Sequence, residues 1–378
     1  MPYGKHYIDE SDINAVIDVL NSDFITQGPI IGEFEKKLAD YFQARYAVVF
    51  NSGTSALHAA YFAMGLKNGD QIITSPITFV STSNAALYLG AKPIFSDVEE
   101  ETGNINASII ECKMNDNVKS IVPVHYAGNP VDLKSIHKLS KENDLVLIED
   151  AAHAMGANYN GHQIGSCQYS DMTIFSFHPV KHITTGEGGA VLTNNSDYYD
   201  KLLTFRSHGI TKENFYSPAD GDWYYEMQHL GYNYRMTDIQ AALGISQLKK
   251  LKNFVERRRK IARIYHEAFE ENPYFNVLTT NENDSSYHLF PILLKDEYQK
   301  KKKEIFNILK NQKLGVQVHY IPVYLQPYYL NNGYKRGTCP IAESFYEKEI
   351  SIPIFPAMTD EDIISVINTV LNTFKKIG

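Results

Sequence analysis

Short apolar runs and helix-like segments alternate from residue 47 to residue 194, and this alternation limits the possible folds more than any other feature. The apolar runs, each the length of a strand, occupy residues 47–50, 71–76, 93–98, 120–126, 145–150, 172–177 and 189–194. Strands separated by helices predict a mostly parallel sheet with helices on its faces, which is an α/β fold. Runs this apolar also predict strands that are buried on both faces.

The segments on either side of this region complete the predicted architecture. Residues 9–21 and 30–42 have the pattern of amphipathic helices. After residue 245 the pattern predicts a long charged helix at 246–271, strands at 286–294 and 315–320, and helices at 300–312 and 360–375. We therefore predict a large domain over residues 1–245, whose N-terminal residues can pack on its neighbour, and a smaller α+β domain over residues 246–378. A chain of 378 residues has the length of two such domains.

Composition and charge exclude several classes of partner. The formal net charge of −8 predicts no broad basic surface and no nucleic-acid partner, and the run Arg257–Arg259 fits a solvated helix face. The cysteines, Cys112, Cys167 and Cys339, are far apart and form no CxxC motif, which favours a reducing cytoplasm over a disulfide framework. We find no signal-peptide pattern and no apolar run near the ~20 residues that cross a bilayer, so no membrane partner is expected.

Polar residues follow the predicted strands, and ligands of open α/β sheets bind at the carboxyl ends of the strands. The strand at 145–150 ends in Glu149 and Asp150, and His153 follows it. A carboxylate at the end of a buried strand needs a partner that offsets its desolvation, and a protonated ring nitrogen is one such partner. Taken alone, however, this segment is more typical of a helix N-cap followed by a hydrogen-bonded histidine.

A single lysine, Lys181, lies between a strand end and a glycine-rich turn in the segment SFHPVKHITTGEGG. A lysine with a lowered pKa forms Schiff bases with aldehydes. Ser176 precedes the lysine, and three glycines of the turn predict a close approach of the backbone to a ligand: Gly186, Gly188 and Gly189. His178 and His182 lack a third ligand at a suitable spacing, so no metal site is predicted.

The segment FNSGTSALHAA, residues 50–60, predicts an anion site. Ser52, Gly53 and Thr54 open a helix directly after a strand. Helix N-termini bind phosphate, although helix capping alone explains Ser52. Phe79, in SPITFVST, adds an aromatic face after the next strand. An anion site, an aromatic ring, a buried carboxylate and a lysine match the phosphate, ring, pyridinium nitrogen and aldehyde of pyridoxal phosphate (PLP).

At this point the chain resembles the sugar aminotransferases of the DegT/DnrJ/EryC1/StrS family, which have the aspartate-aminotransferase (type I) fold. The resemblance runs from Ile8 to near the C-terminus and rests on motifs that occur in the family's order. The motifs are ITQGP, NSGTSALH, SPITFVST, EDAAHA, SFHPVKHITTGEGG, FRSHG, GYNYRMTDIQAALG and VQVHYIPVY. The resemblance implies a PLP-dependent aminotransferase that acts on a nucleotide-linked keto sugar.

The resemblance also implies the roles of the catalytic residues. Lys181 is expected to bind the cofactor aldehyde and to carry the proton during transfer. Asp150 is expected to pair with the pyridinium nitrogen, so that the ring can accept electrons. His153 is expected to contact the cofactor, either by stacking on its ring or by a hydrogen bond near the phenolic oxygen.

The remaining cofactor contacts follow from the same resemblance. Gly53, Thr54 and Ser176 are expected to hold the phosphate, and Phe79 to stack on the ring. Asn233, in GYNYR, is expected to reach the phosphate bound by a neighbouring subunit, which implies a homodimer. Without the resemblance, GYNYR is typical of a surface turn.

Within the family, SFHPVK, FRSHG and VQVHYIPVY are most similar to the branch that acts in pseudaminic acid biosynthesis. That similarity implies L-glutamate as amino donor and a UDP-linked 4-keto-6-deoxy-N-acetylhexosamine as acceptor. The expected sugar-nucleotide contacts are Tyr3, Asp23, Phe24, Ile25, Thr26, Gln317, Val318, His319 and Tyr320.

Several alternatives stay open at this point. The 4-amino-arabinose aminotransferases of lipid A modification share PVHYAG and EDAAHA, but their GYxY motif lacks an equivalent of Arg235. An aminotransferase that acts at C3 of the sugar is another candidate. The family's dehydratases replace the lysine by histidine, so Lys181 disfavours that branch. A PLP-binding regulator would not need both Lys181 and Asp150, and no GxGxxG follows a predicted strand, which disfavours a dinucleotide enzyme.

Overall fold

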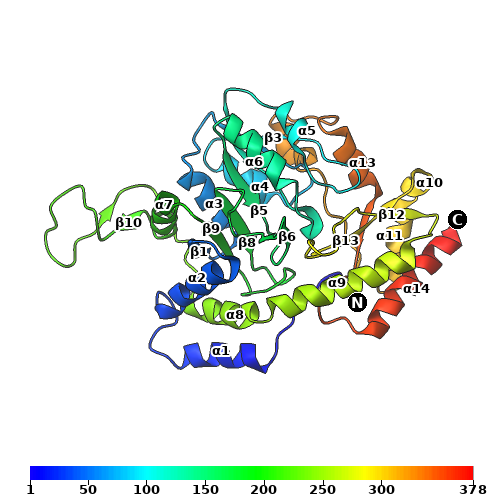
Figure 1. Cartoon of the computed structure of the whole chain (residues 1–378), viewed down its shortest axis with the longest axis horizontal. Coiled ribbons are helices and arrows are strands. Elements are labelled where there is room, and N and C mark those ends of the chain that lie inside the picture. The colour runs from blue at the N-terminus through cyan, green and yellow to red at the C-terminus, as the bar shows by residue number, and fades with distance from the viewer. Residues whose placement is uncertain (378) are drawn as a thin grey trace.

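A seven-stranded sheet forms the centre of the computed structural model, which describes residues 1–377 (Figure 1). The strands are β1 (Tyr46–Phe50), β2 (Gln71–Thr74), β3 (Lys92–Phe95), β4 (Val118–Val122), β5 (Val146–Asp150), β8 (Met172–Ser176) and β9 (Gly189–Thr193). Their order is β1-β9-β8-β5-β4-β2-β3, and β9 runs antiparallel to both of its neighbours. The other pairs are parallel, so the predicted mostly parallel α/β sheet is confirmed.

Alternate residues of the strands enter two different cores, one on each face of the sheet. Leu147 and Phe175 pack on the face covered by α2 (Pro29–Phe42), α6 (Leu133–Glu142) and α8 (Asp238–Leu248). Ile148 and Ile174 pack on the face covered by α3 (Gly53–Ala63), α4 (Ser81–Leu87) and α7 (Ser196–Arg206). Because side chains alternate along a strand, Asp150 and Ser176 belong to the face of α3 and α4.

The first helix, α1 (Glu10–Leu20), starts at a capping box in which Asp9 accepts hydrogen bonds from the backbone of Ser11 and Asp12. It packs along α8 (Figure 1). Lys250, two residues after the end of α8, binds the start of α1 through its Nζ, which lies 2.6 Å from Asp9 and 2.7 Å from Asp12. Helix α2 begins with Pro29 at a position where the missing N–H costs nothing.

The C-terminal part of the chain forms a second core around a three-stranded antiparallel sheet. Its strands are β12 (Phe275–Val277), β13 (Phe290–Leu294) and β14 (Glu349–Ile352), in that order. The helices packed on this core are α9 (Leu251–Phe269), α11 (Lys302–Asn311) and α14 (Asp360–Ile377). Residues Met1 and Tyr3 also contact this part, since Gly315 donates to the carbonyl of Met1 and Ile354 to that of Tyr3.

The remaining elements are short and connect or flank the two sheets. They are α5 (Ala107–Glu111), η1 (Tyr126–Gly128), β6 (Asn158–Tyr159), β7 (His162–Gln163), β10 (Ile210–Thr211), β11 (Glu226–Met227), α10 (Asp296–Gln299), η2 (Val323–Leu325), α12 (Pro327–Asn331) and α13 (Pro340–Lys348). The segment that carries β10 and β11 projects away from the rest of the chain (Figure 1). Across residues 1–377, none of the helices has both the length and the apolar character of a membrane span.

Two predicted elements of the C-terminal part are wrong. The helix predicted at 246–271 is divided, because α8 ends at Leu248 and α9 begins at Leu251. The strand predicted at 315–320 is absent from the described structure, where one isolated bridge joins Gln317 to Ser351. The division into domains at residues 245 and 246 stays a prediction, and that boundary falls inside α8.

The basic run in α9 is not a uniformly solvated face, contrary to the sequence prediction. Arg258 is 1% exposed, and its Nη1 donates to the carbonyl oxygens of Tyr287, His288 and Ile354 at 2.8–3.2 Å. Burial lowers the pKa of this guanidinium to about 9. Arg258 therefore holds the segment before β13 in place, which matters for the cavity described next.

Candidate active site

A cavity of about 890 Å³ lies at the carboxyl ends of β1, β2, β5 and β8. Its walls come from the loops that follow these strands, from residues 317–326 and from the N-terminal segment. The structure brings most of the predicted site residues together in this cavity: Tyr3, Gly53, Thr54, Phe79, Asp150, His153, Ser176, Lys181, Gln317, Val318, His319 and Tyr320. Their roles stay predictions, but their convergence in one place has the form expected of an α/β ligand site.

Asp150 ends β5, and its carboxylate is held in a fixed position. One oxygen, Oδ2, accepts a 2.6 Å hydrogen bond from the hydroxyl of Thr82, and Oδ1 accepts one from the backbone N–H of Ala152 at 3.1 Å. Asp150 is 4% exposed, and the chain after it forms a turn in place of the helix that an N-cap requires. The N-cap interpretation of this segment is therefore wrong, and a buried carboxylate faces the cavity.

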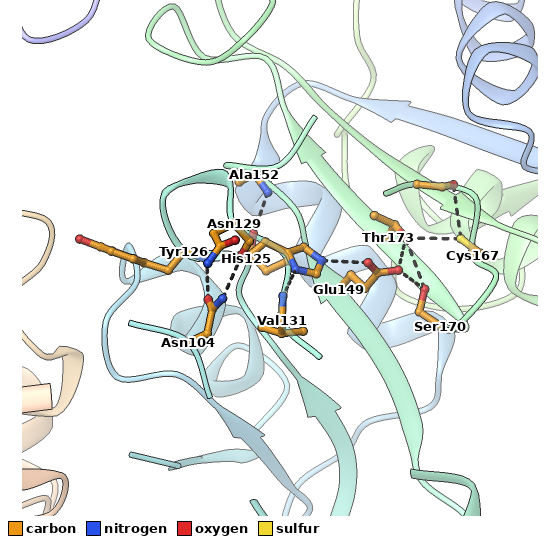
Figure 2. A network of polar contacts seen from close by, with 12 residues as sticks. Asn104, His125, Tyr126, Asn129, Val131, Glu149, Ala152, Cys167, Ser170 and Thr173 are labelled. Atoms are coloured by element: carbon orange, nitrogen blue, oxygen red, sulfur yellow. Dashed lines mark hydrogen bonds and ion pairs between the residues drawn. The ribbon is translucent and has the colours of Figure 1, made fainter. Parts of the chain in front are cut away.

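Glu149 points to the opposite face of the sheet and anchors the end of β5 from there (Figure 2). Its Oε2 accepts a 2.8 Å hydrogen bond from Nε2 of His125, and Oε1 accepts bonds from the hydroxyls of Ser170 and Thr173. Nδ1 of His125 accepts the backbone N–H of Val131 at 3.2 Å, which leaves Nε2 as the nitrogen that donates to Glu149. The backbone N–H of His125 in turn donates to the carbonyl of Asp150 at 3.2 Å.

The helix α3 begins at the cavity and supplies the predicted anion site. Ser52 caps the helix and forms a capping box with Ser55. The N–H groups of a first helical turn have no partner inside the helix, and the helix dipole favours an anion there. A Cβ added at Gly53 would lie 3.0 Å from the Cβ of Ser176, so glycine lets the helix start approach the end of β8. Gly53, Thr54 and Ser176 thus form one small polar surface.

The glycines after Lys181 allow close packing within the protein, and their predicted close approach to a ligand stays a prediction. A Cβ at Gly189 would lie 2.5 Å from the carbonyl oxygen of Ser52, and a Cβ at Gly188 would lie 2.2 Å from Oγ1 of Thr185. Protein atoms alone already require glycine at these two positions. Gly186 has a positive φ of 80°, a conformation that glycine adopts without strain. These glycines let β9 lie close to the start of α3.

Lys181 reaches the cavity from the turn that follows β8. Burial lowers the pKa of its ε-amine from the usual 10.5 to about 8; the nearby Asp150 opposes this shift, and Arg258 adds to it. The nearest side-chain partner of its Nζ is Nε2 of His288, at 3.4 Å. A pKa this low leaves a substantial neutral fraction at physiological pH, and the neutral amine is the form that attacks an aldehyde.

His153 lies beside the lysine and is 4% exposed. Its Nε2 is 3.0 Å from the hydroxyl of Tyr320, while its Nδ1 has no hydrogen-bond partner in residues 1–377. Burial lowers the pKa of His153 well below its usual value and raises that of Tyr320, so both rings are neutral near pH 7. An unpartnered buried nitrogen beside a cavity is a group that a bound cofactor or substrate can satisfy.

The predicted substrate residues 317–320 form one wall of the cavity. His319 is oriented by Ser351, whose hydroxyl is 2.9 Å from Nδ1, and by Glu349, which accepts its backbone N–H at 2.7 Å. The ring of Tyr3 packs against that of His319, with a distance of 5.3 Å between the ring centroids. Phe79, in the loop after β2, also lines the cavity. Because 58% of its surface is exposed, its ring is free to contact a ligand.

Five predicted residues lie outside the cavity of the single chain. Asn233 is exposed, and its backbone pairs with that of Ser207. The backbone carbonyl of Asn233 also accepts a long hydrogen bond from Asn51, which lines the cavity. The segment from Asp23 to Thr26 is exposed as well, and Thr26 pairs with Thr237 at the start of α8. The roles of these five residues stay predictions, and the role of Asn233 depends on a second subunit.

Sequence reasoning missed several residues that hold the site. Thr82 is the last residue of the motif SPITFVST. Its hydroxyl lies four residues after that of Thr78, and this spacing, which lets the two hydroxyls contact each other, is the sequence signal that indicates Thr82. His125 and His288 belong to segments that were interpreted as strands. No local sequence pattern indicates that His125 contacts Asp150 or that His288 contacts Lys181, because both contacts depend on the packing of segments that are far apart in the chain.

The residues of the cavity fit the expected PLP. The polar start of α3 suits its phosphate, the low-pKa amine of Lys181 suits its aldehyde, and the buried Asp150 suits a protonated ring nitrogen. The unpartnered Nδ1 of His153 leaves a donor or acceptor for a further polar group. Within the described residues, no cluster of three or more His, Cys, Asp or Glu side chains has the arrangement of a metal site.

Comparison with known proteins agrees with this chemistry. The sequence profile of the DegT/DnrJ/EryC1/StrS aminotransferase family matches residues 6–371. A UDP-4-amino-4,6-dideoxy-N-acetyl-beta-L-altrosamine transaminase from Campylobacter jejuni is 41% identical over 383 residues, which cover 100% of this chain and 98% of the relative. A Helicobacter pylori protein of the same name is 38% identical over 99% of this chain and 97% of its own length.

Solved structures show the same fold over the whole chain. Helicobacter pylori PseC, described as an aminotransferase involved in the biosynthesis of pseudoaminic acid, has a TM-score of 0.92 at 37% identity, with 99% of each chain covered. Spr1654 from Streptococcus pneumoniae, named as a sugar aminotransferase and solved in its PLP form, has a TM-score of 0.93 at 28% identity, with 100% and 99% covered. The predicted type I fold is confirmed. The chain therefore belongs to the DegT/DnrJ/EryC1/StrS aminotransferase family and is a PLP-dependent sugar aminotransferase.

Proposed function

We propose that this enzyme transfers an amino group from L-glutamate to C4 of a UDP-linked 4-keto-6-deoxy-N-acetylhexosamine. The product is UDP-4-amino-4,6-dideoxy-N-acetyl-β-L-altrosamine, an intermediate of pseudaminic acid biosynthesis. The names of relatives that are 38–41% identical over nearly the whole chain support this substrate. We also propose a cytoplasmic location, which the free thiols of Cys112, Cys167 and Cys339 support.

The observation that carries the proposal is the meeting of Lys181, Asp150 and the start of α3 in one cavity. PLP, when bound, supplies an electron sink that makes the proton on an amine-bearing carbon removable. Lys181 binds the cofactor and moves this proton between carbon atoms with its ε-amine. Asp150 holds a proton on the ring nitrogen, and Thr82 and Ala152 keep its carboxylate aimed at the cavity.

Two neutral side chains complete the proposed binding of the cofactor. His153 and Tyr320 share a 3.0 Å hydrogen bond, and burial keeps both uncharged. With one nitrogen of His153 engaged by Tyr320, the other is available to the cofactor. Phe79, which is 58% exposed and lines the cavity, would stack on the cofactor ring.

The enzyme is proposed to act as a homodimer in which each subunit completes the other's site. In the single chain, Asn233 and residues 23–26 are exposed and do not belong to the cavity walls. Exposed apolar side chains such as Phe24 and Ile25 suit a contact with a second copy of the chain. Asn233 then reaches the cofactor phosphate of the partner, and residues 23–26 reach its sugar nucleotide.

The wall at 317–320 supports a 6-deoxy, N-acetylated sugar over a pentose. Val318 and the ring of Tyr320 offer apolar contacts for a methyl group, while Gln317 and His319 offer hydrogen-bonding groups for an acetamide. A pentose lacks both substituents and leaves this space unfilled. Because one methyl contact in a pocket contributes only about 1–3 kcal/mol, the preference is a ratio of rates and not an absolute exclusion.

The proposal is tested by incubating the enzyme with L-glutamate and a panel of UDP-4-keto sugars and identifying the products by NMR. We expect amination at C4 of UDP-2-acetamido-2,6-dideoxy-β-L-arabino-hex-4-ulose, with a higher kcat/KM than for UDP-4-keto-arabinose. Equal values, or a preference for the pentose, contradict the proposed substrate but not the aminotransferase activity.

A further inference from the structure

His288 lies against the amine of Lys181, although it was not among the residues that the sequence singled out. Its Nε2 is 3.4 Å from Nζ of Lys181, and its ring centroid is 4.4 Å from that of His153. The ring is 4% exposed, and its Nδ1 has no partner within the described part of the chain. His288 therefore lies between the two residues that are proposed to contact the reacting part of the cofactor.

The backbone around His288 is fixed from several directions. The buried guanidinium of Arg258 donates to the carbonyls of Tyr287 and His288. His182 contacts the carbonyl of Ser286 at 3.2 Å, while the hydroxyl of Ser286 donates to the carbonyl of His153 at 3.0 Å. Such a network holds a side chain in one orientation before a ligand arrives, which is how catalytic groups are usually supported.

The conformation before His288 is also costly. Tyr287 has a φ of 48°, in the left-handed region that bulky residues rarely adopt. Strain of this kind persists where the surrounding structure imposes it, and it occurs preferentially at functional sites. Tyr287 directly precedes the histidine whose Nε2 contacts Nζ of Lys181.

His288 is neutral in this environment. Burial lowers its pKa well below the usual value, and Lys181, His153, His182 and Arg258 add to the effect. A neutral imidazole can accept a hydrogen bond from an ammonium group and can also exchange one with a neutral amine. The ring is therefore suited to either protonation state of the lysine.

We propose that His288 is a catalytic residue that binds the ε-amine of Lys181 whenever this amine is not joined to the cofactor. The inference rests on the proposed role of Lys181. During transfer the amine takes one proton from carbon and returns one proton to carbon, so it alternates between its neutral and its ammonium form. His288 accepts a hydrogen bond from the ammonium form, remains neutral throughout, and keeps the amine near the reacting carbon.

The consequence for Lys181 has a definite sign. An acceptor at Nζ stabilises the ammonium form, so removing the acceptor lowers the pKa of Lys181 below its value of about 8. Methionine and glutamine have nearly the same shape, but only glutamine offers an acceptor at about the reach of Nε2. His288→Met and His288→Gln are therefore a matched pair that separates the hydrogen bond from the packing.

The first readout is the rate at which added PLP attaches to enzyme from which the cofactor has been removed. This rate is measured by visible absorbance at a series of pH values. In the wild type, the attachment rate should rise with pH to a midpoint near the pKa of Lys181. In His288→Met we expect this midpoint about one pH unit lower, and in His288→Gln close to the wild-type value. His162→Met is the control, because this histidine of β7 is exposed and lies outside the cavity walls.

The second readout is the single-turnover reaction with glutamate that carries deuterium at the carbon bearing the amino group. His288→Met should slow this reaction by roughly tenfold or more and increase its isotope effect, and His288→Gln should restore most of the rate. Unchanged midpoints and unchanged isotope effects in a folded His288→Met variant overturn the proposal, as does a His288→Gln variant no better than His288→Met. If His288→Met does not fold, His288→Asn, whose shorter side chain falls short of Nζ, takes its place.

Failure of the Lys181 proposal can be recognised separately. Borohydride reduction of the wild-type holoenzyme followed by peptide mapping identifies the residue that carries the cofactor. A label on a residue other than Lys181 rejects the role of the lysine, whereas a label on Lys181 with unaltered His288 variants rejects only the role of His288.

Discussion

At the scale of single residues, the site depends on side chains whose charge is set by burial. Lys181 has a lowered pKa because its surroundings disfavour the ammonium form, and the neighbouring histidines are neutral for the same reason. The buried carboxyl group of Asp150 faces the same cavity near this lysine. The pairing of one available amine with one buried carboxylate is what the proposed chemistry requires.

Asp150→Asn should retain PLP but lose roughly a hundredfold or more in turnover, because the amide no longer holds a proton on the ring nitrogen. The hydrogen bond from Thr82 can persist to the amide oxygen, so the cavity should keep its shape. PLP affinity measured by fluorescence, together with kcat for the glutamate reaction, checks this. A near-normal kcat would mean that Asp150 has a structural role alone.

The residue scale also shows where sequence reasoning stopped. Lys181, Asp150, Gly53 and Ser176 could be predicted because each lies at the end of a strand, in the turn after one, or at a helix start, and the sheet gathers such positions at one edge. The contact between Lys181 and His288 joins residues 107 positions apart. No local pattern encodes that distance, since it depends on how the segment before β13 packs on the sheet.

At the scale of elements, the end of β5 is the part of the sheet that the site depends on most. Its last two side chains point to opposite faces: Asp150 toward the cavity and Glu149 into the network of His125, Ser170 and Thr173 (Figure 2). The seven strands themselves were predictable from their apolar runs. The division of 246–271 into α8 and α9 was not, because charged, helix-favouring residues continue across the break at Lys249 and Lys250.

The hydrogen bond between His125 and Glu149 at the end of β5 predicts that two substitutions differ in their effect on the free energy of unfolding. His125→Ala should destabilise the fold by about 2–4 kcal/mol, because the buried carboxyl group of Glu149 loses a hydrogen-bond donor and a cavity replaces the imidazole. Glu149→Gln should cost about 1 kcal/mol or less, because its amide oxygen can still accept from His125 while its NH₂ group faces two hydroxyls. Urea unfolding at saturating PLP measures both. A His125→Ala variant as stable as Glu149→Gln contradicts this account of the network.

At the scale of the whole molecule, the single chain leaves part of its predicted site open. The cavity contains the cofactor residues of one chain, whereas Asn233 and the segment 23–26 lie on its outside. Two copies related by a two-fold axis can exchange these segments, which is the usual symmetry of such enzymes. The role predicted for Asn233 came from the family resemblance and not from residue patterning, because a symmetry axis leaves no pattern in one chain.

Mixing two inactive variants tests whether each active site contains residues from both subunits. Lys181→Ala and Asn233→Ala should each have little activity, since each lacks one part of every site. In a mixture refolded or co-expressed at equal amounts, half of the dimers contain one complete site, so activity should recover to about a quarter of the wild-type value. Light scattering gives the oligomeric state in parallel. An active monomer, or a mixture no more active than its components, argues against shared sites.

The central claim is that this chain moves an amino group from glutamate to a UDP-linked keto sugar through Lys181. It is tested most directly by supplying ¹⁵N-labelled glutamate with the UDP-4-keto-6-deoxy-N-acetylhexosamine and following the nitrogen by NMR. The wild-type enzyme should place ¹⁵N on C4 of the sugar and release 2-oxoglutarate in equal amount, and Lys181→Ala should do neither. A sugar without ¹⁵N after complete consumption of the substrate, or full transfer by Lys181→Ala, contradicts the account.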